Sequence, residues 1–388
     1  MEINALVKTL TRLVGFDTVS SHSNIELIQW VAERLKALGF ETMVQPGSET
    51  GKANLFATIG PADKPGVMLA GHSDVVPVAG QQWTSDPFVL TRRDDRLYGR
   101  GSADMKGFIA CVLEMAPRFA AAKLVQPVHI ALSYNEETNM DGMRVLTKYL
   151  AQSPVRPVAC VIGEPTSMQV VVANKGAAIF NCRVQGFSVH SSLRDQGVSA
   201  VEVAAEVICY VNRLQERLLG AGRNDGFEFP HTSVHVGRIE GGTAHNITAR
   251  ECTFLLEIRA LPGVRAAQLL EDIKNHCQQV ILPPLLRISK ECSIEFETIA
   301  DTPGLDEGGN RELADVFMPL CGCRDPHRVS FGTEGGILQG IGVPTIVCGP
   351  GEIRVAHQPD EYVEISQLEA CMAFLESLCK RLKTTPYH

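Results

Sequence analysis

The chain has 388 residues, and length alone favours two or three domains of roughly 150 residues each. Hydrophobic residues make up 45% and charged residues 21%, a composition that excludes general disorder and allows a sizeable core. Acidic residues (44) outnumber basic ones (36), so the net charge of −8 argues against a partner that presents a phosphate backbone, such as a nucleic acid.

The N-terminal segment and the cysteines indicate the cellular compartment. Residues 1–14 mix charged side chains with Leu and Val, which predicts an amphipathic helix and lacks the features of a secretion signal. No stretch approaches the roughly 20 apolar residues that span a bilayer. Most of the 12 cysteines stand in apolar runs, as buried reduced thiols do. We therefore expect a cytoplasmic protein with no membrane partner.

The first half of the chain alternates helical and strand patterns. A capping box at 23–26 begins a helix that Gly39 ends, and residues 105–122 predict a second helix. Short apolar runs predict strands at 55–59, 67–70, 128–133 and 159–162. This alternation is typical of an α/β fold with a central mixed sheet and helices on both faces.

The pattern changes after Lys175. Strand, helix, strand, strand, helix and strand are expected in turn over 177–185, 199–219, 232–239, 252–260, 266–280 and 293–298. That order is typical of a ferredoxin-like α+β domain. Features of the first type resume after Asp301, with a strand at 345–348 and a helix at 366–382. We therefore expect one domain of residues 1–176 and 301–388, interrupted by a second domain of residues 177–300.

Five segments place a side chain that can bind metal after an apolar strand or a turn. These side chains are His72, Asp104, the pair Glu136–Glu137, Glu164 and His357. Since the carboxyl ends of strands in α/β sheets are where sites assemble, we expect them to meet in space. Imidazole and carboxylate ligands together suit zinc, as one ion or two.

Each of these residues also has an ordinary structural explanation. A single histidine after a strand is more often a hydrogen-bonded side chain than a ligand, and Asp104 could cap the helix that follows it. Glu136 and Glu137 could be a solvated pair. Glu164 could be a turn residue, and His357 a loop residue. Five such positions together are much harder to explain by chance, which favours the metal site.

Spacing suggests further roles. Asp74 stands two residues after His72, so its carboxylate can reach the ring nitrogen that does not bind metal. Adjacent side chains such as Glu136 and Glu137 diverge, so one can bind metal while the other faces the substrate as a general base.

At these residues the sequence resembles the co-catalytic zinc family of aminoacylases and carboxypeptidases. The matching segments, in family order, are GHSDVVP at 71–77, GRGSADMKG at 99–107, NEET at 135–138, GEPT at 163–166 and AHQPDEY at 356–362. The resemblance implies an α/β catalytic domain with an inserted ferredoxin-like lid, usually used for homodimerisation. It also implies two divalent ions, Zn²⁺ or Co²⁺.

The resemblance assigns roles residue by residue. One ion takes His72 and Glu164, the other takes Glu137 and His357, and Asp104 bridges them. Asp74 orients His72, and Glu136 is the general base.

Further positions come mainly from the resemblance. His190, in GFSVHSS, is expected to stabilise the oxyanion from the partner subunit, where a surface loop histidine is the ordinary reading. Arg259 and Asn246 are expected to hold the substrate carboxylate, where a structural ion pair is the ordinary reading of Arg259. Gly332 and Thr333 are expected in a substrate loop.

The implied activity is hydrolysis of an N-acyl amino acid. Segments such as GPGEIRVAHQPDEY at 349–362 resemble the members that convert N2-acetyl-L-ornithine to L-ornithine and acetate in arginine biosynthesis. Glu334 and Glu352 are candidates for the substrate's side-chain amine. A desuccinylase acting on succinyl-diaminopimelate, or another deacylase or dipeptidase, stays open, and so does an inactive metal-binding scaffold.

Overall fold

The computed structural model describes residues 3–387. Contacts divide the chain into two compact units. The first unit contains the residues up to Ala173, then Leu305–Arg328 and the residues from Thr333 onward. The second unit contains Asn174–Gly304 and Val329–Gly332.

The first unit is built on a mixed sheet of eight strands in the order β1-β2-β6-β3-β7-β14-β8-β13. The strands are β1 Glu41–Pro46, β2 Ala53–Ile59, β3 Val67–His72, β6 Val128–Ser133, β7 Ala159–Pro165, β8 Val171–Asn174, β13 His327–Val329 and β14 Thr345–Gly349. Strands β6, β3, β7 and β14 run parallel. Strand β2 pairs antiparallel with β1 and β6, and β8 pairs antiparallel with β14. The parallel strands end at one edge of the sheet, where a site can form.

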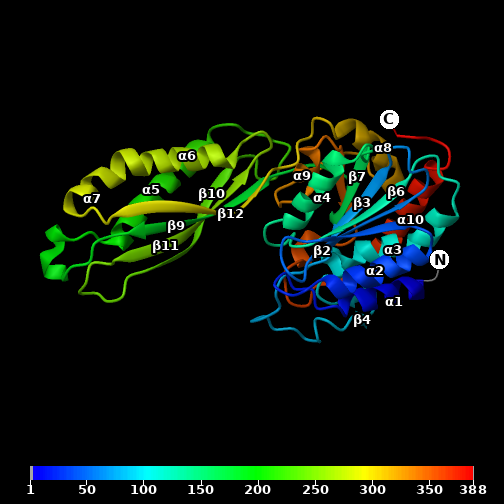
Figure 1. Ribbon diagram of the computed structural model, residues 1–388, viewed down its shortest axis with the longest axis horizontal. Coiled ribbons are helices and arrows are strands. Elements are labelled where there is room, and N and C mark those ends of the chain that lie inside the picture. The colour runs from blue at the N-terminus through cyan, green and yellow to red at the C-terminus, as the bar shows by residue number, and fades with distance from the viewer. Residues whose placement is uncertain (1–2, 388) are drawn as a thin grey trace. The chain divides into compact units, whose positions relative to one another are not determined.

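Helices cover both faces of this sheet (Figure 1). They are α1 Ile3–Val14, α2 Ile25–Ala37, α3 Gly107–Ala121, α4 Asp141–Gln152, α8 Arg311–Cys321, α9 Gly335–Gln339 and α10 Ile365–Arg381. Strands β3 and β6 are buried at every residue, as is usual for strands covered on both sides. Leu69 and Ile130 pack in the same cluster as α3 residues such as Phe108 and Ile109. The predicted α/β arrangement is confirmed.

The capping prediction for α2 is wrong in detail. The N-cap is Asn24, and its side chain makes no capping hydrogen bond. The side-chain nitrogen Nδ2 of Asn24 instead donates to Ala53 O and Ser73 Oγ, both at 2.8 Å. Asn24 therefore connects the start of α2 to β2 and to the residue after β3. Gly39 does follow the helix and has a φ of +90°, a conformation that glycine adopts without strain.

A small antiparallel sheet in the first unit was not predicted. It contains β4 Thr91–Arg93, β5 Arg96–Tyr98 and β15 Tyr362–Glu364, in the order β15-β5-β4. Strands of three residues carry too little periodicity to be recognised in a sequence. This sheet brings the segment after Tyr98 beside the segment before Tyr362, since these two residues pair directly.

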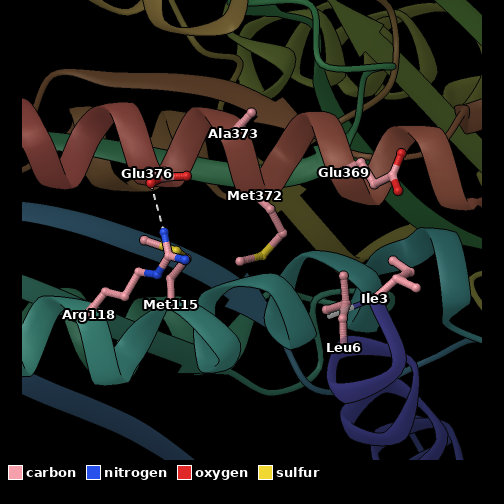
Figure 2. Close-up of a pocket in the computed structure, with 8 residues that line it drawn as sticks. All are labelled: Ile3, Leu6, Met115, Arg118, Glu369, Met372, Ala373 and Glu376. Carbon is pink, nitrogen blue, oxygen red and sulfur yellow. Dashed lines mark ion pairs between the residues drawn. The ribbon is translucent and has the colours of Figure 1, made fainter. Parts of the chain in front are cut away.

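Helices α1, α3 and α10 pack around a cavity of about 200 Å³ (Figure 2). Its lining residues are Ile3, Leu6, Met115, Arg118, Glu369, Met372, Ala373 and Glu376. Arg118 and Glu376 form an ion pair across it at 2.8 Å, with both side chains more than 40% exposed. None of the candidate ligands lines this cavity.

No helix within residues 3–387 combines the length and the apolar character that a membrane span requires.

The second unit has a ferredoxin-like order of elements. They are β9 Gly176–Gln185, α5 Ala200–Leu219, β10 Ser233–Gly241, β11 Glu251–Ala260, α6 Ala266–His276, α7 Leu282–Ile288 and β12 Ser293–Thr302. The sheet order is β10-β11-β9-β12, with every neighbouring pair antiparallel. The helical region extends beyond 280 because Pro283 and Pro284 stand in the first turn of α7, where a missing N–H is tolerated.

Candidate active site

The candidate metal ligands of the first unit meet at the carboxyl edge of the large sheet. His72 is the last residue of β3, and Glu164 lies near the end of β7. Glu137 follows the end of β6, and His357 follows β14. Asp104 comes from η1, a short turn at Ser102–Lys106 that follows β5. Parallel strands with a common direction therefore bring distant parts of the sequence together.

Asp104 lies between the two histidines. Its Oδ1 atom is 3.0 Å from His72 Nε2, and its Oδ2 atom is 3.3 Å from His357 Nε2. His357 Nε2 also lies 2.9 Å from Glu137 Oε2, and His72 Nε2 lies 3.7 Å from Glu164 Oε1. Each histidine nitrogen therefore faces Asp104 and one glutamate, which is the arrangement a bridging carboxylate requires.

The donor atoms are close enough to hold divalent cations. Two groups have ligand atoms that all lie within 4.8 Å of one another: His72 with Glu136 and Glu164, and His72 with Asp104 and Glu137. Glu164 is 4% exposed, and its Oε1 atom has no hydrogen-bond partner among residues 3–387. Buried carboxylates without partners are costly, and a mixed set of imidazoles and carboxylates suits zinc. The residues therefore fit divalent ions.

Burial is the main cause of the pKa shifts of the three glutamates in the cluster. Burial raises the pKa of Glu137 to about 7, and the neighbouring charge of Asp104 acts in the same direction. Burial also raises the pKa of Glu136 and of Glu164 well above the usual value for a glutamate. Such shifts are typical of sites where carboxylates are crowded together.

The pKa values of Asp104 and His357 shift in the directions expected for an ion pair. Burial opposes ionisation of Asp104, but hydrogen bonds from His357 and His72 hold its pKa well below the usual range. Contacts with Asp104 and Glu137 raise the pKa of His357 to about 10. The cluster therefore attracts positive charge, whether as protons or as a metal ion.

Asp74 contacts His72 through a different atom from the one expected. His72 Nδ1 lies 2.9 Å from the main-chain oxygen of Asp74 and 3.7 Å from its Oδ1 atom. Because the carbonyl can only accept, Nδ1 carries a proton, which leaves Nε2 as the ring nitrogen that can exchange its own proton for an ion. The Asp74 carboxylate instead accepts hydrogen bonds from Glu136 N at 3.1 Å and Glu137 N at 3.3 Å. Its role therefore includes fixing the glutamate pair.

Four of the predicted substrate residues belong to the second unit. They are His190, Asn246, Arg259 and Gly332. His190 is exposed, and Ser191 N donates to Asn246 O at 2.9 Å, so His190 and Asn246 lie close to each other. Arg259 pairs with Glu257 at 2.6 Å and is 37% exposed. These contacts leave the expected substrate roles untested.

Thr333 belongs to the first unit and is buried, with Oγ1 accepting from Gly335 N at 3.1 Å. The two acidic candidates for a substrate amine differ in environment. Glu334 is 1% exposed, and burial raises its pKa to about 7. Glu352 is exposed and lies 3.6 Å from Arg354 Nε.

Sequence reasoning missed two buried charges beside the cluster, Arg100 and Glu361. Both stand inside the segments that carry the family resemblance, GRGSADMKG and AHQPDEY. A charged residue in a stretch otherwise expected to be buried is the signal that could have revealed them.

The fold and the cluster of side chains define the class of protein, a metal-dependent hydrolase. Residues 68–381 match the family described as peptidase family M20/M25/M40. The chain belongs to this family.

Similar proteins agree with this assignment. The acetylornithine deacetylase of Photorhabdus laumondii subsp. laumondii is 37% identical over 94% of this chain and 94% of its own length. That of Proteus mirabilis is 36% identical over 91% of this chain and 89% of its own. An M20 family metallo-carboxypeptidase from Sulfolobus solfataricus shares the fold, with a TM-score of 0.74, 17% identity and coverage of 99% and 100%.

Proposed function

We propose that the protein hydrolyses N2-acetyl-L-ornithine to L-ornithine and acetate, a step of arginine biosynthesis. The observation that carries the chemistry is the convergence of His72, Asp104, Glu137, Glu164 and His357. The choice of substrate rests on the relatives named acetylornithine deacetylase, at 36% and 37% identity over most of both chains.

In this proposal, His72 and Glu164 would hold one divalent ion, zinc or cobalt, Glu137 and His357 would hold the other, and Asp104 would serve both. The ions supply Lewis acidity, which acidifies water and polarises the acyl carbonyl. The chain's own contribution is to hold these ligands in place before any ion binds. The hydrogen bond from His72 Nδ1 to Asp74 O aims Nε2 at the ligand position.

Glu136 acts as the general base. Its backbone is fixed by Asp74, and its side chain lies within the same group of donor atoms as His72 and Glu164. The Glu136 carboxylate takes a proton from water and later gives it to the nitrogen of the leaving amine. Burial raises the pKa of Glu136, which suits a group that must hold a proton between the two steps.

Three residues of the second unit, together with the neighbours Gly332 and Thr333 at the boundary of the units in the sequence, complete the proposal. His190 stabilises the oxyanion from the partner subunit, so the active form is a homodimer. The proposed location is the cytoplasm. Arg259 holds the α-carboxylate with its guanidinium fork, together with Asn246. Gly332 and Thr333 line the substrate.

The test is a substrate screen with zinc- and cobalt-loaded protein. N-acetylornithine, other N-acetyl amino acids, N-succinyl-diaminopimelate and dipeptides are compared by kcat/KM, with release of acetate or succinate as the readout. We expect N-acetylornithine to give the highest value. A higher kcat/KM for the succinylated compound or a dipeptide would identify that compound as the substrate instead. No turnover of any compound would favour the inactive scaffold.

A further inference from the structure

A buried Arg–Glu pair joins the loops that carry Asp104 and His357. Arg100 and Glu361 are each 1% exposed, and Arg100 Nη1 lies 2.7 Å from Glu361 Oε2. Arg100 follows β5 and Glu361 precedes β15, and Gly99 N donates to Glu361 O at 2.9 Å where these strands meet. The small sheet therefore sets the two charges opposite each other.

The second oxygen of Glu361 binds the backbone of the Asp104 turn. Glu361 Oε1 accepts from Ala103 N at 2.9 Å and from Asp104 N at 3.1 Å. Asp104 has φ −119° and ψ 92°, which is not helical, so a regular helix does not satisfy its N–H. The carboxylate supplies that acceptor, and it fixes the backbone from which the Asp104 side chain reaches His72 and His357.

Arg100 reaches the other loop through Gln81. Arg100 Nη2 donates to Gln81 Oε1 at 2.6 Å, and Gln81 Nε2 donates to the main-chain oxygen of His357 at 2.8 Å. His357 has a φ of +64°, in a region that residues other than glycine occupy only when the surroundings hold them there. One guanidinium therefore links Glu361, on the Asp104 side, to the backbone of His357.

We infer that Arg100 and Glu361 are a positioning pair that sets the distance between Asp104 and His357, and so the affinity of the ion these two residues share. The inference rests on the proposed function, since it matters only if both are ligands. A buried ion pair is often no more stable than apolar side chains of the same volume, so stability alone does not account for this one.

The geometry predicts that loss of the Arg100–Glu361 pair lowers the affinity for one ion more than for the other. His72 and Glu164 belong to β3 and β7 of the large sheet, whose positions do not depend on the pair. Asp104 and His357 belong to the loops that the pair connects, and of these two only His357 would serve a single ion. Loss of the pair therefore weakens the ion bound by Glu137 and His357 more than the ion bound by His72 and Glu164. A purely structural role would weaken both together.

The experiment is a calorimetric zinc titration of the full chain after chelator treatment. The main variant replaces both partners, Arg100→Met with Glu361→Met, because removing one alone leaves a buried unpaired charge. We expect two binding steps in the wild type. In the double variant we expect one step weakened about 10- to 100-fold, as for other groups that orient metal ligands, and the other within about threefold.

Three further variants sharpen the result. Arg100→Met with Glu361→Gln leaves no unpaired charge and keeps an oxygen that can accept from Ala103 N and Asp104 N, so it should recover part of the weakened step. Gln81→Ala removes the link from Arg100 to His357, together with a hydrogen bond from Trp83 Nε1, and should weaken the same step. The control is Glu376→Gln, which breaks the exposed pair with Arg118 and should leave both steps unchanged.

The outcomes are distinguishable. A folded double variant with both steps at wild-type strength, or with both weakened equally, overturns the inference. If the double variant does not fold, Gln81→Ala decides, and an unchanged titration there overturns it. If the wild type binds no zinc, the proposed function fails and the inference fails with it.

Discussion

At the scale of single residues, the site depends on which oxygen of a residue, main-chain or carboxylate, each donor meets. Asp74 shows this, because its main-chain oxygen orients His72 while its carboxylate holds the backbone of Glu136 and Glu137. Asp74 therefore fixes Glu136 through the backbone and not through the carboxylate that a general base uses to transfer a proton.

The first prediction concerns Glu136→Gln. An amide cannot take a proton from water, so kcat should fall by about 100- to 10,000-fold, the usual contribution of a general base. Glu136 is not a proposed ligand, so metal content measured by atomic absorption should stay at the wild-type value. Near-normal turnover in a variant that keeps its metal would refute the role of Glu136.

The second prediction concerns Arg259→Ala. If Arg259 binds the α-carboxylate, KM for the acylated amino acid should rise while metal content stays constant. Arg238→Ala is a matched control, because Arg238 also pairs at 2.6 Å with an acidic residue two positions away, Glu240. Loss of metal from the Arg259 variant, or an equal rise in KM for the control, would show a structural role instead.

At the scale of elements, the close approach of β7 and α3 positions Glu164. A Cβ atom on Gly163 would lie 2.0 Å from the ring of Phe108, which is 1% exposed. Only glycine therefore allows β7 to pass this helix and present Glu164 at its end.

The third prediction follows from this contact. Gly163→Ala should destabilise the protein by about 1–3 kcal/mol, the usual penalty for overpacking, and should lower the thermal midpoint. Gly309→Ala is the control, since a Cβ atom there meets nothing within 4 Å. Equal midpoints for the two variants would contradict the packing argument.

The pairing of β2 and β6 buries a histidine away from the site. His129 Nδ1 lies 2.8 Å from Thr58 Oγ1, its ring stacks on Phe56, and Nε2 has no hydrogen-bond partner among residues 3–387. Burial lowers the pKa of His129 to about 4, from 6.5 in the unfolded chain. The stability that neutral His129 contributes is therefore complete above pH 6.5 and is lost as the pH falls toward 4.

The fourth prediction is that His129→Phe reduces sensitivity to acid. The shift corresponds to at most about 3 kcal/mol, lost by the wild type between pH 7.5 and 4 and not by the variant. Thermal midpoints measured across this range should fall further for the wild type. Parallel curves for the two proteins would show that His129 does not titrate on unfolding.

Regular elements could be predicted from the sequence, but contacts between distant short segments could not. The pattern at 128–133 located β6 to the residue, because a strand buried on both faces is mostly apolar, here with His129 and Ser133 as the exceptions. The pairing of β5 with β15, and with it Arg100 and Glu361, has no local pattern. The side chains proposed as ligands could be selected because each stands at or after the end of a strand or a turn. The atom by which Asp74 meets His72, in contrast, depends on three-dimensional geometry.

At the scale of the whole molecule, a mixed sheet gathers two imidazoles and several buried carboxylates from across the first unit. Such an excess of buried acidic groups is stable when divalent cations balance it. The account therefore predicts two ions, one on each side of Asp104.

The most direct test is a crystal structure of the zinc-loaded protein with anomalous data at the zinc absorption edge. We expect two peaks about 3.5 Å apart, the usual spacing of a two-metal site, one contacting His72 and Glu164 and the other Glu137 and His357. Fully loaded protein with no peak at these residues would contradict the account.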